Sequence, residues 1–184
     1  MQKRSDVTVL KGNRVFLRSV ERRDLNFYYE MWSDDEVRKF DSGFTIIPSN
    51  DFIIENFDKI MNLKKKHLTI VNEKGVVVGY ITYEALQDCK NVFEIGITIR
   101  KDFRGRGYGK DSIQTLTKFL FLNVAAKRVE LQMVCDNEKA LNCYKTCGFI
   151  QEGVLREKFF SEGKYKDLIV MAMIEEDFNK HYKM

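Results

Sequence analysis

Residues 104–109, which read RGRGYG, decide the fold of this chain. Residues 93–99 (FEIGITI) precede them and alternate apolar with polar or small side chains, which predicts a β-strand. In residues 113–124, which follow, apolar side chains recur at near-helical spacing and predict an amphipathic helix. The glycines of RGRGYG therefore lie in a loop that leads from a strand into a helix.

Glycines at every second position let the backbone approach a ligand, because no side chain stands in the way. The helix that follows directs its unpaired N–H groups and the positive end of its dipole at the same place. This combination binds phosphate, and Arg104, Arg106 and Lys110 add positive charge to it. The sequence predicts a phosphate-binding loop at residues 104–110.

The spacing of these glycines excludes two common phosphate loops. The chain has no G-x-x-x-x-G-K-[ST] pattern, so the loop is not of the Walker type. It also lacks G-x-G-x-x-G with a suitably placed acidic residue downstream, which excludes the dinucleotide fingerprint. The pattern present is R-x-x-G-x-G, from Arg104 to Gly109.

A second motif, NEKALNCYKTCGF, covers residues 137–149 and follows another alternating segment at 129–133. Asn137 is a good helix N-cap and Gly148 a good helix terminator, so a helix of about three turns fits between them. Ala140 and Tyr144 are four residues apart and share one face of this helix.

Other segments complete the expected order of elements. We expect a strand at 14–20, helices at 23–32 and 49–63, and two strands at 68–71 and 76–83 around a turn at 72–75. The second helix has Ile53, Phe57, Ile60 and Met61 on one face, and Pro48 precedes it. Two β-rich runs around a Gly-containing turn predict a hairpin within 152–173. These elements favour one α/β or α+β domain with a mixed sheet.

The two motifs resemble the signatures of the GNAT superfamily of N-acetyltransferases, in which R-x-x-G-x-G binds the pyrophosphate of acyl-CoA. The second motif matches as N-x-x-A-x-x-x-Y-x-x-x-G-F. Three further stretches resemble the ribosomal-protein and spermidine N-acetyltransferase branch: RVFLR at 14–18 followed by ERRDL at 21–25, EGVLRE at 152–157, and F-x-x-G-x-Y-x-D at 160–167. The resemblance runs from about Lys11 to about Phe178.

The resemblance implies a GNAT fold of the α/β (α+β) class, with residues 1–184 forming a single N-acetyltransferase domain whose core spans about 11–178. Helices would flank a central mixed, mostly antiparallel sheet that splays between strands 93–99 and 128–134, and the pantetheine arm of acetyl-CoA would lie between those strands. The implied cofactor-binding residues are Ile97, Thr98, Ile99, Arg104, Gly105, Arg106, Gly107, Tyr108, Gly109, Lys110, Asn137, Ala140, Tyr144 and Lys145.

Amide formation requires a proton acceptor, because a protonated amine has no lone pair to attack a thioester. Glu94 is the predicted base, and Glu84 is the alternative. The resemblance puts Tyr144 near the sulfur of acetyl-CoA, where its O–H would protonate the leaving thiolate. Cys143 and Cys147 have no His near them in sequence to activate a thiol, so direct attack in a ternary complex is preferred to a covalent route.

The acceptor stays open among a polyamine, a small amine or antibiotic, a free amino acid and a protein N-terminus. Four acidic residues in the expected acceptor wall would attract a cationic amine: Asp34, Asp35, Glu36 and Asp41. Two alternatives to an enzyme remain: a non-catalytic acyl-CoA sensor of the same fold, and a regulatory module that binds a nucleotide at the same loop.

Composition narrows the class of protein further. The 184 residues carry a mild net charge of +4 and no basic stripe with interleaved aromatics, so we expect no nucleic-acid partner. No long apolar run and no signal peptide at Met1–Asp6 are present, so we expect a cytoplasmic protein without a membrane partner. Four cysteines make no disulfide framework or zinc site, and we expect no metal. A homodimer or higher homo-oligomer is compatible with these features.

Overall fold

The computed structural model describes residues 9–40, 49–57, 59, 64–86 and 91–183. Their elements, in chain order, are β1 (Val9–Lys11), β2 (Val15–Ser19), η1 (Arg22–Asp24), α1 (Leu25–Ser33), α2 (Asp35–Arg38), α3 (Asn50–Glu55), β3 (Lys66–Asn72), β4 (Val77–Ala85), β5 (Val92–Ile99), η2 (Lys101–Phe103), α5 (Tyr108–Asn123), β6 (Arg128–Val134), α6 (Glu138–Thr146), β7 (Ile150–Ser161), β8 (Lys164–Ile174) and α7 (Glu175–Tyr182). In this part of the chain no helix is long and apolar enough to cross a membrane.

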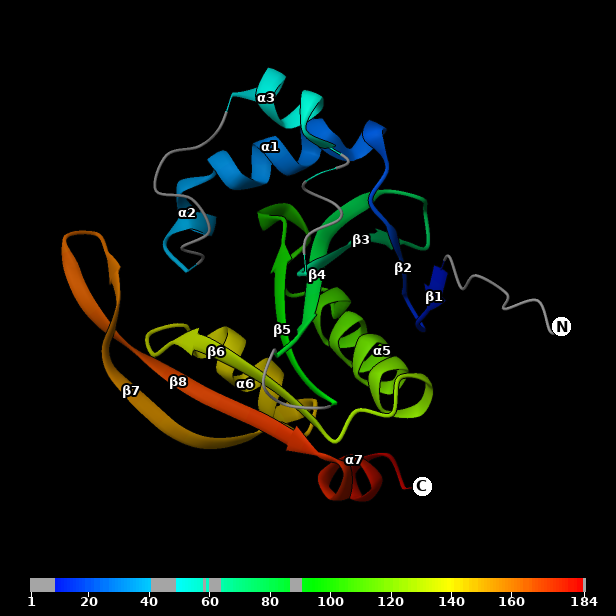
Figure 1. Cartoon of the computed structure of the whole chain (residues 1–184), viewed down its shortest axis with the longest axis vertical. Helices are drawn as coiled ribbons and strands as arrows, with labels where there is room; N and C mark the ends of the chain where they lie inside the picture. Colours follow the sequence, from blue (N-terminus) through cyan, green and yellow to red (C-terminus); the bar gives the residue numbers. More distant parts are fainter. Residues whose placement is uncertain (1–8, 41–48, 58, 60–63, 87–90, 184) are drawn as a thin grey trace, which may run out of the picture.

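The described strands form one eight-stranded sheet in the order β1-β2-β3-β4-β5-β6-β8-β7 (Figure 1). Neighbouring strands are antiparallel everywhere except between β5 and β6, which are parallel. A parallel pair needs a crossover connection, and α5 supplies it. The predicted mixed, mostly antiparallel sheet flanked by helices is confirmed.

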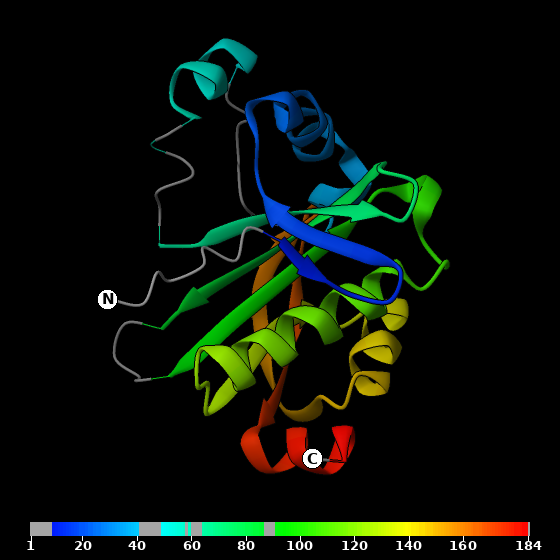
Figure 2. The ribbon, with the colours of Figure 1, turned by 90° about the vertical axis from the view of Figure 1, so that its right-hand side faces the viewer.

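One face of the sheet packs against α5, α6 and α7. The alternating side chains of β5 and β6, such as Ile95 and Leu131, join Ile113 and Leu116 of α5 in a single buried cluster. Figure 2 shows α5 crossing the strands on this face, with α6 beside it. We call this the α5 face; it is the main apolar core of the protein.

The opposite face, which we call the α1 face, packs against α1, α2 and α3. A smaller buried cluster there joins Tyr28 and Trp32 of α1, Val37 of α2 and Tyr80 of β4. Asp24 anchors this layer to the sheet: its buried carboxylate accepts hydrogen bonds from the Arg18 guanidinium at 2.6 and 2.8 Å and from the Thr69 hydroxyl at 3.0 Å. The α1 layer is therefore held to the strands by a charge-assisted network as well as by packing.

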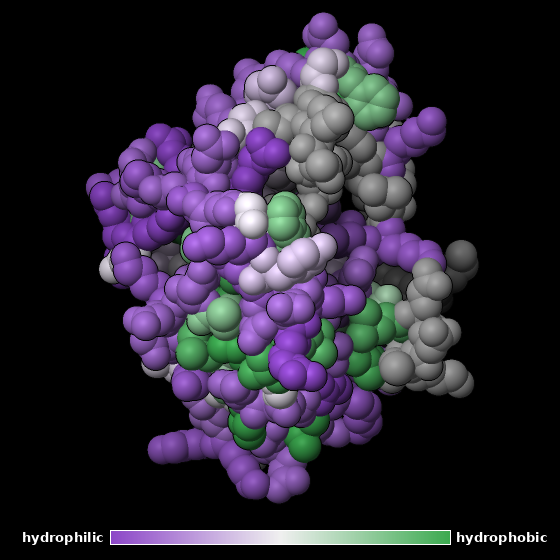
Figure 3. All heavy atoms as spheres, turned by 90° about the vertical axis from the view of Figure 1, so that its left-hand side faces the viewer, coloured by the Kyte–Doolittle hydropathy of each residue, from purple (hydrophilic) through white to green (hydrophobic). Residues whose placement is uncertain are grey.

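β7 and β8 form a long hairpin that projects from the body of the protein (Figure 1). β7 is the edge strand, and its register is interrupted between Gln151 and Gly153 and again between Leu155 and Phe159. Such irregularities bend an edge strand and blunt it as a template for pairing. Figure 3 views the side from which the hairpin projects: the surface is mostly hydrophilic, with apolar atoms in separate patches.

The expected elements agree with the structure apart from their ends. The helix predicted at 23–32 starts with the short η1 before α1, and Ser49 caps α3 by accepting a hydrogen bond from the Phe52 N–H at 3.2 Å. α3 ends at Glu55, earlier than the predicted helix end, and Ile60 and Met61 lie outside the described residues.

Candidate active site

β5 and β6 pair with each other over only three residue pairs, from Val92–Arg128 to Glu94–Glu130. Beyond that row β5 continues to pair with β4, and β6 continues to pair with β8. Residues 95–99 and 131–134 therefore form two strand edges that diverge from each other, a feature we call the β5–β6 split. The predicted splay between these strands is confirmed, and Glu94 lies at its apex.

The register on β4 determines which backbone groups of β5 face the split. The Arg100 N–H donates to the Val78 carbonyl at 2.9 Å, and the Leu86 N–H donates to the Val92 carbonyl at 3.0 Å. Because these groups alternate along a strand, the even-numbered residues of β5 bond to β4 and the odd-numbered ones face the split. Ile97 and Ile99 thus present their N–H and C=O groups to the split.

This alternation corrects one detail of the sequence prediction. Thr98 lies opposite Tyr80 in the register, and its main-chain N–H and C=O groups are directed at β4. They are not available to a pantetheine arm in the split, and its side chain lies on the α1 face with those of Glu94 and Gly96. Ile97 and Ile99 remain candidates for main-chain hydrogen bonds to that arm.

The predicted phosphate loop leads directly into α5. Gly107 is the N-cap residue of α5 and has φ +83°, in the left-handed region that favours glycine. No side chain caps the first turn, so its N–H groups stay open to an anion. Arg14 supports the loop from the β1–β2 turn, because its Nη1 donates to the Arg106 carbonyl at 2.7 Å. The main chain and dipole therefore have the arrangement that phosphate binding requires.

The other predicted cofactor-binding residues lie in the loop, in the first turn of α5, and on or next to α6. Arg104, Gly105 and Arg106 precede α5, and Tyr108, Gly109 and Lys110 form its first turn. The Tyr108 side chain is buried beside Phe103, so only its main chain faces the loop side. On α6, Asn137 is a cap whose Oδ1 accepts from the Ala140 N–H at 3.2 Å, while the Lys145 side chain is exposed. Their roles toward a cofactor stay predictions.

Tyr144 lies on the α5 face. It is 6% exposed, belongs to the main core cluster, and packs its ring edge-on against Phe149 with centroids 5.9 Å apart. Burial raises the pKa of its hydroxyl above the ordinary value, and the nearby Cys143 and Cys147 raise it further. The phenol therefore stays protonated at neutral pH and has a proton to donate.

Glu94 lies on the α1 face, in the last row where β5 and β6 pair. Glu84 of β4 is opposite it on one side and Glu130 of β6 on the other, so three carboxylates form one row across the sheet. Burial raises the pKa of Glu94; Lys65 opposes the rise, and Glu84 and Glu130 add to it. We call Glu84, Glu94 and Glu130 the carboxylate row.

Gly96 leaves space on the α1 face next to Glu94. A Cβ atom built there would lie 3.1 Å from the Thr82 hydroxyl oxygen, which is tighter than ordinary contact. A side chain at this position would therefore crowd the surface of the sheet beside the carboxylate row. Glycine keeps that surface open.

Sequence reasoning missed a bridge that supports the carboxylate row. The Arg128 guanidinium donates to Glu130 at 2.6 Å and to both carboxylate oxygens of Glu152, at 2.8 and 2.5 Å. These contacts fix the Glu130 carboxylate beside Glu94 and tie β6 to β7. Arg128 and Glu130 alternate with the core residues of β6, which signals that they share one polar face, but the contact with Glu152 depends on the sheet order.

Part of the predicted acidic wall is used within the protein. Asp34 caps α2 by accepting from the Glu36 N–H at 2.7 Å. Glu36 itself accepts from Lys101 Nζ at 2.9 Å and from Arg104 Nη1 at 3.1 Å. Asp41 lies outside the described residues. Two of the four acidic residues thus have structural partners, and the carboxylate row becomes the better candidate to meet a cationic amine.

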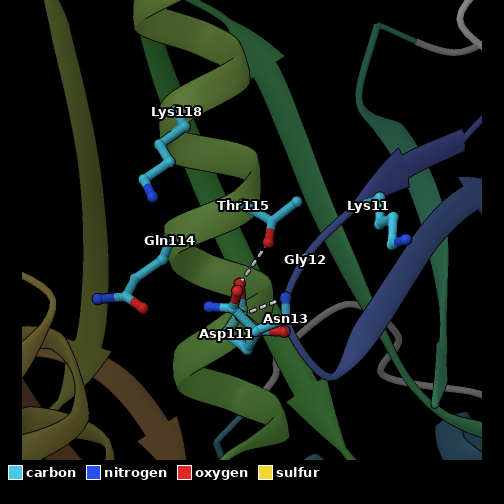
Figure 4. A pocket seen from close by; sticks show the side chains of 7 residues that line it. All are labelled: Lys11, Gly12, Asn13, Asp111, Gln114, Thr115 and Lys118. Carbon is cyan, nitrogen blue, oxygen red and sulfur yellow. Dashed lines mark hydrogen bonds between the residues drawn. The ribbon is translucent and has the colours of Figure 1, made fainter. Parts of the chain in front are cut away.

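A pocket of about 280 Å³ lies elsewhere, between the β1–β2 turn and α5 (Figure 4). Asp111 dominates it: its carboxylate accepts from the N–H groups of Asn13, Arg14 and Val15 at 3.1, 2.7 and 3.1 Å. This carboxylate fixes the turn onto α5, as Figure 4 shows for Asn13. The pocket contains neither Glu94 nor Tyr144. The role of Asp111 in it is structural, because its carboxylate holds the β1–β2 turn to α5.

The three cysteines in the described residues, Cys135, Cys143 and Cys147, are free thiols. Cys147 is buried, and its Sγ contacts the Lys110 carbonyl at 3.8 Å. The described residues contain no cluster of three His, Cys, Asp or Glu side chains that could hold a metal ion.

Comparison with known proteins identifies relatives along most of the chain. Residues 14–150 match the acetyltransferase (GNAT) domain family. The spermidine N(1)-acetyltransferase of Vibrio cholerae is 24% identical over 177 residues, which cover 91% of this chain and 96% of that protein. The Escherichia coli K12 enzyme of the same name is 23% identical over 174 residues, covering 94% of this chain and 92% of that protein.

Comparison with solved structures identifies relatives of the same kind. The crystal structure of spermidine N-acetyltransferase from Vibrio cholerae in complex with CoA and spermine superposes with a TM-score of 0.81, at 23% identity, over 89% of this chain and 97% of that chain. The split between two parallel strands, the glycine loop and the helix carrying Tyr144 are thus set in a known architecture. The chain belongs to the GNAT acetyltransferase family, and it is an acyltransferase that uses acetyl-CoA as the donor.

Proposed function

We propose that this protein transfers the acetyl group of acetyl-CoA to a cationic primary amine, with polyamines as the first class of acceptor, by direct attack in a ternary complex. One observation carries the proposal: Glu94, a half-buried carboxylate, lies at the apex of the β5–β6 split on the α1 face, and Tyr144, a buried phenol, belongs to the core cluster on the α5 face. A base and an acid on opposite faces fit an amine and a thioester that meet through the split.

The acetyl donor would enter from the side of the phosphate loop. The first turn of α5 and the loop cations would bind its pyrophosphate. The odd-numbered main-chain groups of β5, from Ile97 and Ile99, would bond the pantetheine arm as an added strand does. The thioester would then lie toward the apex, where the two faces meet.

The acceptor would lie on the α1 face, over the carboxylate row. An alkyl ammonium ion has an ordinary pKa near ~10 and must lose a proton before its nitrogen can attack. Glu94 accepts this proton, directly or through water, and its raised pKa makes it a stronger base. Glu84 and Glu130 favour a positively charged acceptor over a neutral one.

The products form when the C–N bond is made and the C–S bond breaks. A main-chain N–H that faces the split, such as that of Ile97, would donate to the oxyanion of the tetrahedral intermediate. Tyr144 would give its proton to the departing CoA thiolate. Cys143 and Cys147 take no part in this route, since the amine attacks the thioester directly.

The relatives support a polyamine as the first acceptor to test. Two of them are named spermidine N(1)-acetyltransferases, and a solved relative was crystallised with CoA and spermine. A polyamine carries several ammonium groups, so it suits a row of carboxylates better than a neutral or zwitterionic amine does.

A panel of amines tests this function with thiol release as the readout. The panel contains spermidine, spermine, an aminoglycoside, free amino acids and a peptide with a free N-terminus. We expect the highest kcat/KM for the polyamines, and double-reciprocal lines that intersect when both substrates are varied. Turnover of the peptide alone would contradict the polyamine assignment, and parallel lines would contradict the ternary complex.

A further inference from the structure

One carboxylate from the acceptor side holds Arg104 of the phosphate loop and Lys101 of η2, which precedes the loop. Glu36 lies on α2, whose Val37 packs with Tyr80 on the α1 face. Its two oxygens accept from Lys101 Nζ at 2.9 Å and from Arg104 Nη1 at 3.1 Å. These partners are 65 and 68 residues away in sequence, so the contact joins two separate parts of the fold.

Arg104 also covers a main-chain group at the edge of the β5–β6 split. Its Nε donates to the Ile99 carbonyl at 2.9 Å while its Nη1 contacts Glu36. The Ile99 carbonyl is one of the odd-numbered groups that face the split. In this arrangement Arg104 donates hydrogen bonds both to a main-chain carbonyl of the split and to the Glu36 carboxylate on α2.

The negative charge of a diphosphate competes for the same cations. Hydrogen bonds from Lys101 and then Arg104 lower the pKa of Glu36, so it is ionised at neutral pH. All three side chains are exposed, which makes each contact individually weak and exchangeable. A ligand with two charged phosphates at the α5 N-terminus can therefore draw Arg104 and Lys101 away from Glu36.

We propose that Glu36 is a positioning residue that couples the two substrate sites. The phosphates of CoA take Arg104 and Lys101 from Glu36, and the freed carboxylate then adds to the attraction of the α1 face for the cationic amine. Each substrate thereby strengthens the binding of the other. The inference rests on the proposed function, because it requires a cationic acceptor.

The experiment measures binding by isothermal titration with CoA, which cannot be turned over, and with spermidine as the amine probe. Glu36→Gln keeps the shape and removes the charge. Glu30→Gln is the matched control, since Glu30 is an exposed carboxylate on α1 with no ion pair recorded to the loop. Thermal unfolding of each variant checks that the fold is intact.

We expect Glu36→Gln to bind CoA about two- to fivefold more tightly in the absence of spermidine, because a competing ion pair is gone. In the wild type, CoA and spermidine should raise each other's affinity by one common factor. In Glu36→Gln this factor should fall toward one, while Glu30→Gln should match the wild type in both measurements. Higher salt should reduce the differences.

Two results would overturn the role of Glu36 and leave the proposed function standing. One is CoA affinity in Glu36→Gln that equals or falls below that of the wild type, which would make the carboxylate a simple organiser of the loop. The other is an unchanged coupling factor in Glu36→Gln. If spermidine bound no form of the protein, with or without CoA, the polyamine acceptor and the coupling would both be wrong.

Discussion

The two faces of the sheet carry the two residues of the proposed chemistry, and burial raises the pKa of both. On the α5 face, Tyr144 is enclosed by apolar side chains, and burial raises its pKa so that it keeps its proton. On the α1 face, Glu94 is half-buried in a row of carboxylates, and burial raises its pKa so that it binds an abstracted proton more firmly. Desolvation, the largest cause of both shifts, thus suits Tyr144 to the proposed role of acid and Glu94 to the proposed role of base.

The comparison also separates the two substrates. The α5 face carries the phosphate loop, the open first turn of α5 and Tyr144, to which the proposed function assigns the acyl donor. The α1 face carries Glu94 and its neighbours, to which it assigns the acceptor. If this division is correct, variants on the α5 face should change kcat or the affinity for acetyl-CoA, and variants on the α1 face should change the response to the amine and to pH.

The largest effect is expected for Tyr144→Phe. The ring still packs on Phe149, but the proton for the leaving thiolate is lost, so kcat should fall by about 10²–10⁴-fold with little change in acetyl-CoA affinity. Single-turnover kinetics and titration with CoA measure the two quantities. Tyr182→Phe, which removes a buried hydroxyl on α7, is the control. Wild-type kcat in Tyr144→Phe, with chemistry rate-limiting, would make Tyr144 a packing residue only.

Glu94→Gln comes next. It keeps the shape of the side chain and removes the base, so kcat/KM for the amine at neutral pH should fall by about 10²-fold. Activity should partly recover at high pH, where the amine loses its proton unaided, and CoA affinity should be nearly unchanged. A rise in KM without recovery at high pH would assign Glu94 to electrostatic attraction of the amine instead.

Gly107→Val tests the donor side of the comparison. A valine at φ +83° strains the N-cap and places a side chain where the phosphates approach, so acetyl-CoA binding should weaken more than tenfold, or by about 1.4 kcal/mol. Gly75→Val is the control, because it carries the same backbone penalty at φ +78° in the β3–β4 turn. Equal CoA affinities in the two variants, with the circular dichroism spectrum intact, would argue against the phosphate loop.

The smallest effect is expected for Glu84→Gln, which tests whether the carboxylate row acts as a unit. Burial contributes most to the raised pKa of Glu94, and Glu84 adds a repulsion that this variant removes. The acidic limb of the kcat/KM profile should then move to lower pH, because the pKa of Glu94 falls when this repulsion is removed. Lys65→Met should move it the opposite way, since Lys65 lowers the pKa of Glu94. Shifts in the same direction would contradict this account.

Much of the local structure was predictable because it depends on neighbours in sequence. The strand at 93–99, the loop at 104–110 and the following helix agree with β5, the glycine N-cap and α5. Asn137 caps α6 as expected, and Gly148 ends it with φ +95°. In each case the residue's own backbone preference or its side chain's reach to a nearby N–H determines the conformation.

The direction of backbone groups in β5 was harder to predict. Alternation in the sequence tells which side chains share a face, but the bonding partner of each N–H depends on the neighbouring strand and its register. The Arg100–Val78 and Leu86–Val92 bonds settle that register, and they turn Thr98 toward β4. The sequence alone therefore could not separate Thr98 from Ile97 and Ile99.

The amino-acid sequence by itself determined the family, the strand–loop–helix unit at the phosphate loop, and the two residues, Tyr144 and Glu94, that carry the proposed chemistry. Only the tertiary structure decided what surrounds them: the carboxylate row, the Arg128 bridge and the contact of Glu36 with the loop. The physical reason is the distance in sequence over which each kind of interaction acts. Capping, turns and periodicity act over a few residues, whereas burial, ion pairs and the strand register join residues that are distant in sequence and meet only in the folded sheet.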